Sequence, residues 1–328
     1  MPDEGYRRLK IAMSGDRKKE MMILFLVGAG LAVLPLLVGE FYLYVIRLII
    51  IYAISALGLN IFMGFTGQIN IGSAGFFCIG AYLSTMLQVK LGWHYMVAFP
   101  ISIIASLFVA WGMSFPLLRL RGHAMAIGTL SFAMAINLIS ERFPSLTGGA
   151  DGIVVPSMGL FGQTMGNNFY YYLILAIGMV TYLICLFLVD SRIGRAFRAI
   201  KDDEAAAAAM GVHVEHYKTL AWVINGVFAG MAGSLYAQQA GFLSPTTFSL
   251  WTNIIVLVMI VVGGLGTNFG SVMGSAIMTS LPYFLVTIQQ FILLVQGLVL
   301  FFFLRFLPDG VVGTVAKHYG RPALKRGG

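Results

Sequence analysis

Two segments place glycines and uncharged polar side chains inside long apolar sequence, and their residue types suit non-covalent handling of a solute. Segments 64–75 and 263–274 both begin with Gly-x-x-Gly and end with Gly-Ser before a further glycine. Irregular backbone at bilayer depth must be buried in protein or line a wet cavity, and paired glycine-broken segments point to a translocation path. The alternative is that these glycines only allow close helix packing. The predicted path residues are Gly64, Thr66, Gly67, Gln68, Asn70, Ser73, Gly263, Gly264, Gly266, Thr267 and Asn268.

Covalent chemistry has little support in the sequence. The carboxylates lie in tails, loops or near the expected helix ends, and the apolar segments contain neither a His/Asp/Glu cluster nor a convincing pair of nucleophile and base. The phosphate-loop pattern G-x-x-x-x-G-K-[ST] is also missing, so ATP hydrolysis is not expected of this chain. We therefore predict no catalytic residue, no metal site and no cofactor held by the chain itself.

A charged segment, 190–211, interrupts the apolar sequence and should lie in water. Its residues are good helix formers, and Gly211 is positioned to end a helix. Asp202, Asp203 and Glu204 suit the N-terminus of a second short helix, and Arg195 and Arg198 share one helix face. Docking of a cytoplasmic partner is one interpretation, and anchoring of the cations to anionic lipid is the other.

Membrane-spanning helices must position these segments. With 59% apolar and 10% charged residues, the 328-residue chain is a polytopic membrane protein. Since a span needs about 20 apolar residues, we predict an all-α bundle of about eight to ten transmembrane spans with glycine-broken helices. The expected spans are 21–38, 41–63, 68–87, 95–118, 124–139, 169–189, 219–240, 253–264, 270–288 and 291–307.

The cationic residues predict the orientation. Most of the 21 lysines and arginines fall in the leader, near 119–121, in 190–218 and in the C-terminal tail, which places both termini in the cytoplasm. The predicted regions are a basic tail (1–20), a transmembrane domain (21–307) with a cytoplasmic coupling loop (190–218), and a second basic tail (308–328). Arg47 lies close to an expected outer helix end, where snorkelling to the lipid interface is the simpler expectation.

The longest expected external loop contains three glycines and one carboxylate between Leu146 and Ile153. This composition predicts a tight, shaped turn. Gly149 and Asp151 are candidates for contact with an external partner, and a simple chain reversal is the alternative.

Several motifs, in order along the chain after Tyr52, resemble the permeases of branched-chain amino acid ABC transporters, and the second-permease branch is the more similar. The stretch Gly-Arg-Ala-Phe-Arg-Ala-Ile-Lys-Asp-Asp-Glu-Ala-Ala at 194–206 is similar to the cytoplasmic loop of that family, as is Gly-Phe-Thr-Gly-Gln at 64–68. The resemblance implies a bacterial-type inner-membrane importer with a second permease, cytoplasmic ATPases that use ATP and Mg, and an extracytoplasmic solute-binding protein. The residues that match its ATPase-contacting loop are Glu204, Ala205, Ala206 and Gly211.

On these grounds we expect a permease subunit that moves branched-chain or related hydrophobic amino acids, with the energy supplied by partner subunits. A urea or short-amide importer is the first alternative, because those importers have similar permeases. An ion-coupled carrier would typically need ionisable residues within its spans, which makes it the weaker alternative.

Overall fold

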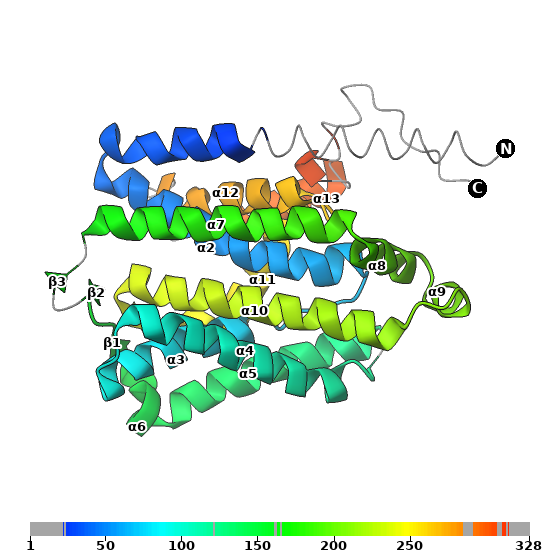
Figure 1. Ribbon diagram of the computed structural model, residues 1–328, viewed down its shortest axis with the longest axis horizontal. Helices are drawn as coiled ribbons and strands as arrows, with labels where there is room; N and C mark the ends of the chain where they lie inside the picture. The colour runs from blue at the N-terminus through cyan, green and yellow to red at the C-terminus, as the bar shows by residue number, and fades with distance from the viewer. Residues whose placement is uncertain are drawn as a thin grey trace.

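The computed structural model describes residues 22, 24–120, 122–160, 163–164, 166–284, 291–306, 310–312 and 314. Long, nearly parallel helices form a single bundle (Figure 1). The predicted tail 1–20 and most of the predicted tail 308–328 lie outside the described residues. The expected all-α membrane bundle with broken helices is confirmed.

The helices have the following bounds: an apolar N-terminal helix at Leu24–Leu36, α2 Glu40–Leu59, a π-helical continuation at Asn60–Phe65, α3 Ser73–Leu91, α4 Tyr95–Leu117, α5 His123–Arg142, α6 Pro144–Thr147, α7 Asn167–Asp190, α8 Arg192–Asp202, α9 Glu204–Ala209, α10 Val214–Ala240, α11 Leu250–Gly263, α12 Asn268–Phe284 and α13 Ile292–Phe306. Short 3-10 turns occupy Gly149–Asp151 and Pro245–Phe248. Two-residue strands pair antiparallel: β1 Ile153–Val154 with β4 Phe242–Leu243, and β2 Gly159–Leu160 with β3 Gln163–Thr164.

Six of these helices are long and apolar enough to cross a bilayer: α2 with its π-helical end, α3, α4, α5, α7 and α10. Leu24–Leu36, α11 and the Leu294–Phe303 part of α13 are apolar but shorter. The helices on both sides of the second glycine segment, α11 and α12, have 14 and 17 residues. The chain is therefore a multi-pass membrane protein whose second broken region is built from short helices.

The centre of the bundle is α10, which packs against α2, α3 and α4. Small residues make this possible, because a β-carbon added at Gly80 would lie 1.9 Å from the carbonyl oxygen of Gly230. One added at Gly233 would lie 1.9 Å from the carbonyl oxygen of Phe77. Close backbone approach of this kind is how helices associate where lipid removes the hydrophobic driving force.

The first broken segment differs from the expected span 68–87, because α3 begins only at Ser73. Gly67 has φ of +72°, outside the helical region, and the chain then runs without regular structure to Gly72. Asn70 explains the late start, because its side-chain oxygen accepts from the Gly72 N–H at 2.7 Å, a local bond that competes with helix formation.

The expectation for Arg47 is wrong, because the side chain is buried within the protein and does not extend towards lipid. It is 6% exposed and forms an ion pair with Glu40 at 3.1 Å. Its guanidinium also donates to the backbone carbonyl of Asn167 at 3.2 Å, at the start of α7. A nearby carboxylate and a helix carbonyl therefore hold this charge within the protein, which lowers the penalty for burying it.

Candidate translocation and coupling site

The structure brings the two glycine-broken segments together at the end of the bundle where α8 and α9 lie (Figure 1). Asn60, in the π-helical end of α2, connects them. Its amide nitrogen donates to the carbonyl of Thr267 at 3.0 Å, and its amide oxygen accepts from the N–H of Gly266 at 2.8 Å. A β-carbon at Gly64 would lie 2.6 Å from the Gly266 nitrogen, so glycine is required for this approach.

The irregular stretch of the first segment, 67–72, leads into a buried polar cluster to which several helices contribute side chains. The Ile71 N–H donates to Thr129 Oγ1 of α5 at 3.1 Å, and the Ala74 N–H donates to Asn253 Oδ1 of α11 at 2.7 Å. Ser73 Oγ donates to Asn225 Oδ1 of α10 at 3.1 Å. The bonds from Ile71 and Ala74 satisfy backbone donors at the N-terminus of α3 that have no partner within the helix, and the Ser73 bond joins the side chains of α3 and α10.

Asn225 carries the unusual group of this cluster. The residue is completely buried, and within the described part of the chain its Nδ2 has no hydrogen-bond partner. A cavity of about 400 Å³ lies beside Asn253, and Asn137 and Ser249 also line it. Asn253 is therefore a buried amide at a cavity, and such a group can bind the polar part of a small solute without any covalent step.

The sequence prediction missed Thr129, Asn225 and Asn253. A usable signal was present, since each is a polar residue within a predominantly apolar helix, and such residues are costly unless they have a partner. Of the predicted path residues, Asn70 and Ser73 belong to the cluster, and Thr66 is buried with its hydroxyl donating to the carbonyl of Phe62.

The second segment is a tighter turn. Gly264 and Gly266 have φ of +122° and +79°, and α12 resumes at Asn268. Thr267 Oγ1 donates to the Gly264 carbonyl at 2.8 Å. A β-carbon at Gly263 would lie 1.8 Å from the carbonyl oxygen of Gly270, so α11 and α12 cross with their backbones in contact.

The charged segment forms the two predicted short helices. Ser191 caps α8, and Asp203 caps α9 by accepting from the Ala205 and Ala206 N–H groups at 2.7 and 3.0 Å. Gly211 has φ of +84° and ends α9 in a Schellman motif, in which the N–H groups of 211 and 212 bond back to the carbonyls of 208 and 207. The prediction of two helices ended by Gly211 is confirmed.

The predicted coupling residues do not all face outward. Arg195, Ala205, Ala206 and Gly211 are exposed. Arg198 instead donates to the Val189 carbonyl of α7 at 2.8 Å, where it caps a helix C-terminus.

The carboxylate of Glu204 points towards the bundle. Its Oε1 accepts from Gln68 Nε2 at 2.8 Å and lies 2.5 Å from Lys218 Nζ of α10. The Lys218 side chain is 8% exposed, whereas that of Glu204 is 39% exposed. The ion pair thus joins the start of α9 to the start of α10 and to the first broken segment.

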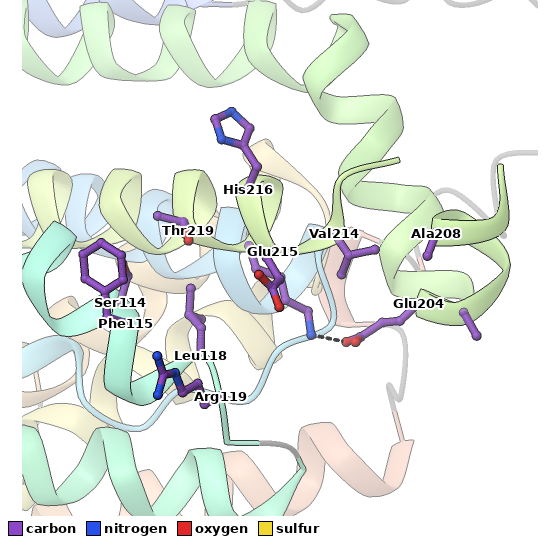
Figure 2. Close-up of a pocket in the computed structure, with 12 residues that line it drawn as sticks. Ser114, Phe115, Leu118, Arg119, Glu204, Ala208, Val214, Glu215, His216 and Thr219 are labelled. Carbon is purple, nitrogen blue, oxygen red and sulfur yellow. Dashed lines mark ion pairs between the residues drawn. The ribbon is translucent and has the colours of Figure 1, made fainter. Parts of the chain in front are cut away.

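A cleft of about 540 Å³ opens beside this ion pair (Figure 2). Arg119 and Leu118, at the end of α4, form one side, and Glu204 and Ala208 of α9 form another. Glu215 and Thr219 of α10 complete it. The lining mixes both signs of charge with apolar side chains, which suits a protein surface better than a small apolar ligand.

The predicted external candidates lie at the opposite end of the bundle from α8 and α9 (Figure 1). Asp151 is exposed, whereas Gly149 is buried with φ of +60°. Gly148 and Gly152 also have positive φ, so the predicted tight turn is confirmed. Pairing of β1 with β4 fixes the turn against the end of α10.

Multi-pass helices, two broken segments in contact and a charged helix pair at one end of the bundle are the features of a membrane permease. Residues 41–304 match the family described as the permease component of branched-chain amino acid transport systems. The chain belongs to this family.

Curated relatives match between about half and nearly all of this chain. The high-affinity branched-chain amino acid transport system permease protein LivM of Salmonella typhimurium is 26% identical over 96% of this chain and 79% of its own length. The high-affinity branched-chain amino acid transport system permease protein LivH of Escherichia coli is 25% identical over 69% of this chain and 79% of its own length. The autoinducer 2 import system permease protein LsrC of Yersinia pseudotuberculosis is 27% identical over 52% of this chain and 49% of its own length. No solved structure matches the chain significantly.

Proposed function

We propose that this chain is the permeation subunit of an ATP-binding-cassette importer that moves branched-chain or related hydrophobic amino acids across a bacterial-type inner membrane. Separate ATPase subunits would use ATP and Mg, a second permease would complete the pathway, and an extracytoplasmic binding protein would deliver the solute. Family membership and the names of the relatives LivM and LivH support this proposal.

The single observation that carries the mechanism is the contact between the charged helix pair and the broken segments. The α8–α9 pair projects beyond the long helices at one end, yet Lys201 and Glu204 bond to the first segment there. A partner that moves α9 would therefore also move the backbone of the proposed path. Alternating access requires such a link between the energy source and the gate.

The solute path in this proposal follows the broken segments and the buried polar cluster. The predicted path residues, together with Asn225 and Asn253, would bind the polar ends of the solute as it passes. With α8 and α9 in the cytoplasm, the exposed Asp151 would face the binding protein on the other side, and the buried Gly149 would shape the turn that presents it. The concentration of cations in the charged segment supports this orientation.

Reconstitution tests the proposal. The chain, its partner permease and the ATPases are placed in vesicles, and uptake of radiolabelled leucine is measured with binding protein and ATP. Glu204→Arg and Ala206→Trp should each abolish uptake while membrane insertion is unchanged, because one reverses an inward-facing charge and the other fills an exposed docking surface. Ile104→Trp, on the exposed face of α4, is the matched control. Normal uptake by both coupling variants would contradict the coupling role.

The solute needs a separate test, because the relative LsrC is named for autoinducer 2 import. The same vesicles are given leucine, isoleucine, valine, urea and acetamide in parallel. Preferential uptake of the branched amino acids supports the proposal. Uptake of urea or acetamide alone would assign the chain to the alternative, and accumulation on an ion gradient without ATP would overturn both.

A further inference from the structure

The corner between α8 and α9 contacts the first broken segment through two side chains, one from each helix. Lys201, in the last turn of α8, donates from Nζ to the carbonyl oxygen of Gly64 at 2.6 Å. Glu204, the first residue of α9, accepts from Gln68 at 2.8 Å. We call these two contacts the corner link. They lie on either side of the Asp203 cap and bond to residues four apart in the first segment.

The corner link also lies against the second segment. A β-carbon added at Gly266 would lie 3.6 Å from Lys201 Nζ and 3.2 Å from the Gly64 carbonyl oxygen. One added at Gly67 would lie 3.2 Å from Lys201 Cγ. The lysine side chain therefore lies where both segments meet, and its ammonium group bonds to a backbone carbonyl in the last turn of the π-helix, where carbonyls lack partners within the helix.

Both contacts of the corner link involve a charged group. A bond from an ammonium group to a backbone carbonyl is charge-assisted and therefore stronger than a neutral bond, and water screens part of this gain because Lys201 is exposed. The Glu204 carboxylate is held in place by Lys218, which is nearly buried. Displacement of the corner alone would break the bonds of Lys201 to the Gly64 carbonyl and of Glu204 to Gln68, so the corner and the first segment should move together.

We propose that Lys201 is a positioning residue for energy coupling, and that the corner link transmits displacement of α8 and α9 to the glycine-broken segments. This inference rests on the proposed function. Lys201 touches neither the solute nor ATP in this mechanism. This proposal differs from the expectation based on the family resemblance, which assigned Glu204 to contact with the ATPase. Glu204 bonds inward to Gln68, so the exposed Ala205 and Ala206 would make the contact with the ATPase.

The test measures uptake and ATP hydrolysis in the same reconstituted complex. Lys201→Met approximately keeps the length of the side chain and removes the ammonium group. ATP hydrolysis should continue, whereas the amount of solute moved per ATP should fall about tenfold. This is the factor expected from the loss of one charge-assisted hydrogen bond. Lys201→Arg restores a donor for the Gly64 carbonyl and should recover most of the uptake. Lys90→Met removes the same group from an exposed position at the far end of α3 and is the control.

A covalent replacement keeps the proposal testable if Lys201→Met inserts poorly. A β-carbon at Gly67 would lie 3.6 Å from Lys201 Cβ, within the range that a disulfide spans. Gly67→Cys with Lys201→Cys is made in a chain whose buried Cys78 and Cys185 are replaced by alanine. In the reduced state this chain lacks the ammonium bond and carries a side chain at position 67, where the φ of +72° strains it, so it should transport poorly. Closing the disulfide with an added oxidant should raise uptake, because the corner and the segment are joined again.

The outcomes separate the two proposals. If the unmodified complex shows no ATP-driven uptake, the proposed function fails. If the unmodified complex transports and Lys201→Met keeps its full yield per ATP, only the corner link is overturned. A disulfide that forms but lowers uptake further also overturns it, because the two parts would then have to separate during transport.

Discussion

The two glycine-broken segments share a sequence pattern but are held by different means. The first has no regular structure from Gly67 to Gly72, and side chains of α5, α8, α10 and α11 bond to its polar groups. The second turns within 264–267 and is fixed by backbone contact between α11 and α12. The first can therefore respond to displaced helices, whereas the second is a compact turn against which it can move.

The largest effect is expected where the second segment has no room. Gly263→Ala would place a methyl group 1.8 Å from the carbonyl oxygen of Gly270 and force α11 and α12 apart. We expect a loss of about 3 kcal/mol, at the upper end of the usual cost of overpacking. Thermal unfolding of the purified chain in detergent measures it. Gly112→Ala, where nothing lies within 4 Å of the added carbon, should unfold no earlier than the unmodified chain, because alanine is the better helix former inside α4.

Removal of the connection between the segments should have the next largest effect. Asn60→Leu retains the approximate volume and leaves the Gly266 N–H and the Thr267 carbonyl without their side-chain partner. Unsatisfied backbone groups of this kind should cost about 2 kcal/mol. The melting temperature and leucine uptake should both fall. Unchanged values would show that the segments are positioned independently of each other.

Asn253→Leu tests the first segment by itself. It removes the acceptor for the Ala74 N–H at the start of α3, which lies within the buried cluster. We expect about 1.5 kcal/mol of destabilisation and faster amide hydrogen exchange near 70–74. Exchange within 264–267 should not change. An equal increase in amide exchange rate in both segments would show that they are not held independently of each other.

The smallest effect is expected from Thr267→Val in the second segment. The substitution removes the 2.8 Å hydroxyl bond to the Gly264 carbonyl and leaves the backbone crossing intact. About 0.5–1 kcal/mol should be lost, the net value of one ordinary hydrogen bond. A melting-temperature change as large as that of Gly263→Ala would mean that side-chain bonds, rather than the backbone fit, hold this turn.

Much of the architecture could be predicted from the sequence, because apolar runs of span length and glycine or proline breaks act locally. The sequence predicts the helix pair in 190–211, including Gly211 as the residue that ends it. This was possible because a Schellman glycine depends only on the turn of chain around it. The late start of α3 was not predicted. It depends on Asn70 bonding to Gly72 and on acceptors in other helices.

The candidate site divides in the same way. Asn70 and Ser73 were predicted because they lie beside glycines, whereas Asn225 and Asn253 lie in uninterrupted apolar helices. Arg198 and Glu204 were identified as coupling residues, but only their contacts show that both point inward. Side-chain direction depends on partners more than 100 residues away in the case of Glu204 and Gln68, which residue type cannot reveal.

The sequence by itself determined a charge-poor helical membrane bundle, its two glycine-broken segments and its capped extramembranous helices. Hydropathy, glycine and capping residues specify these features over a few turns of chain. Only the tertiary structure decided that the two segments meet at Asn60 and that Lys201 joins the charged corner to them. Those contacts arise from packing of distant helices, and a one-dimensional pattern does not contain the distances between them.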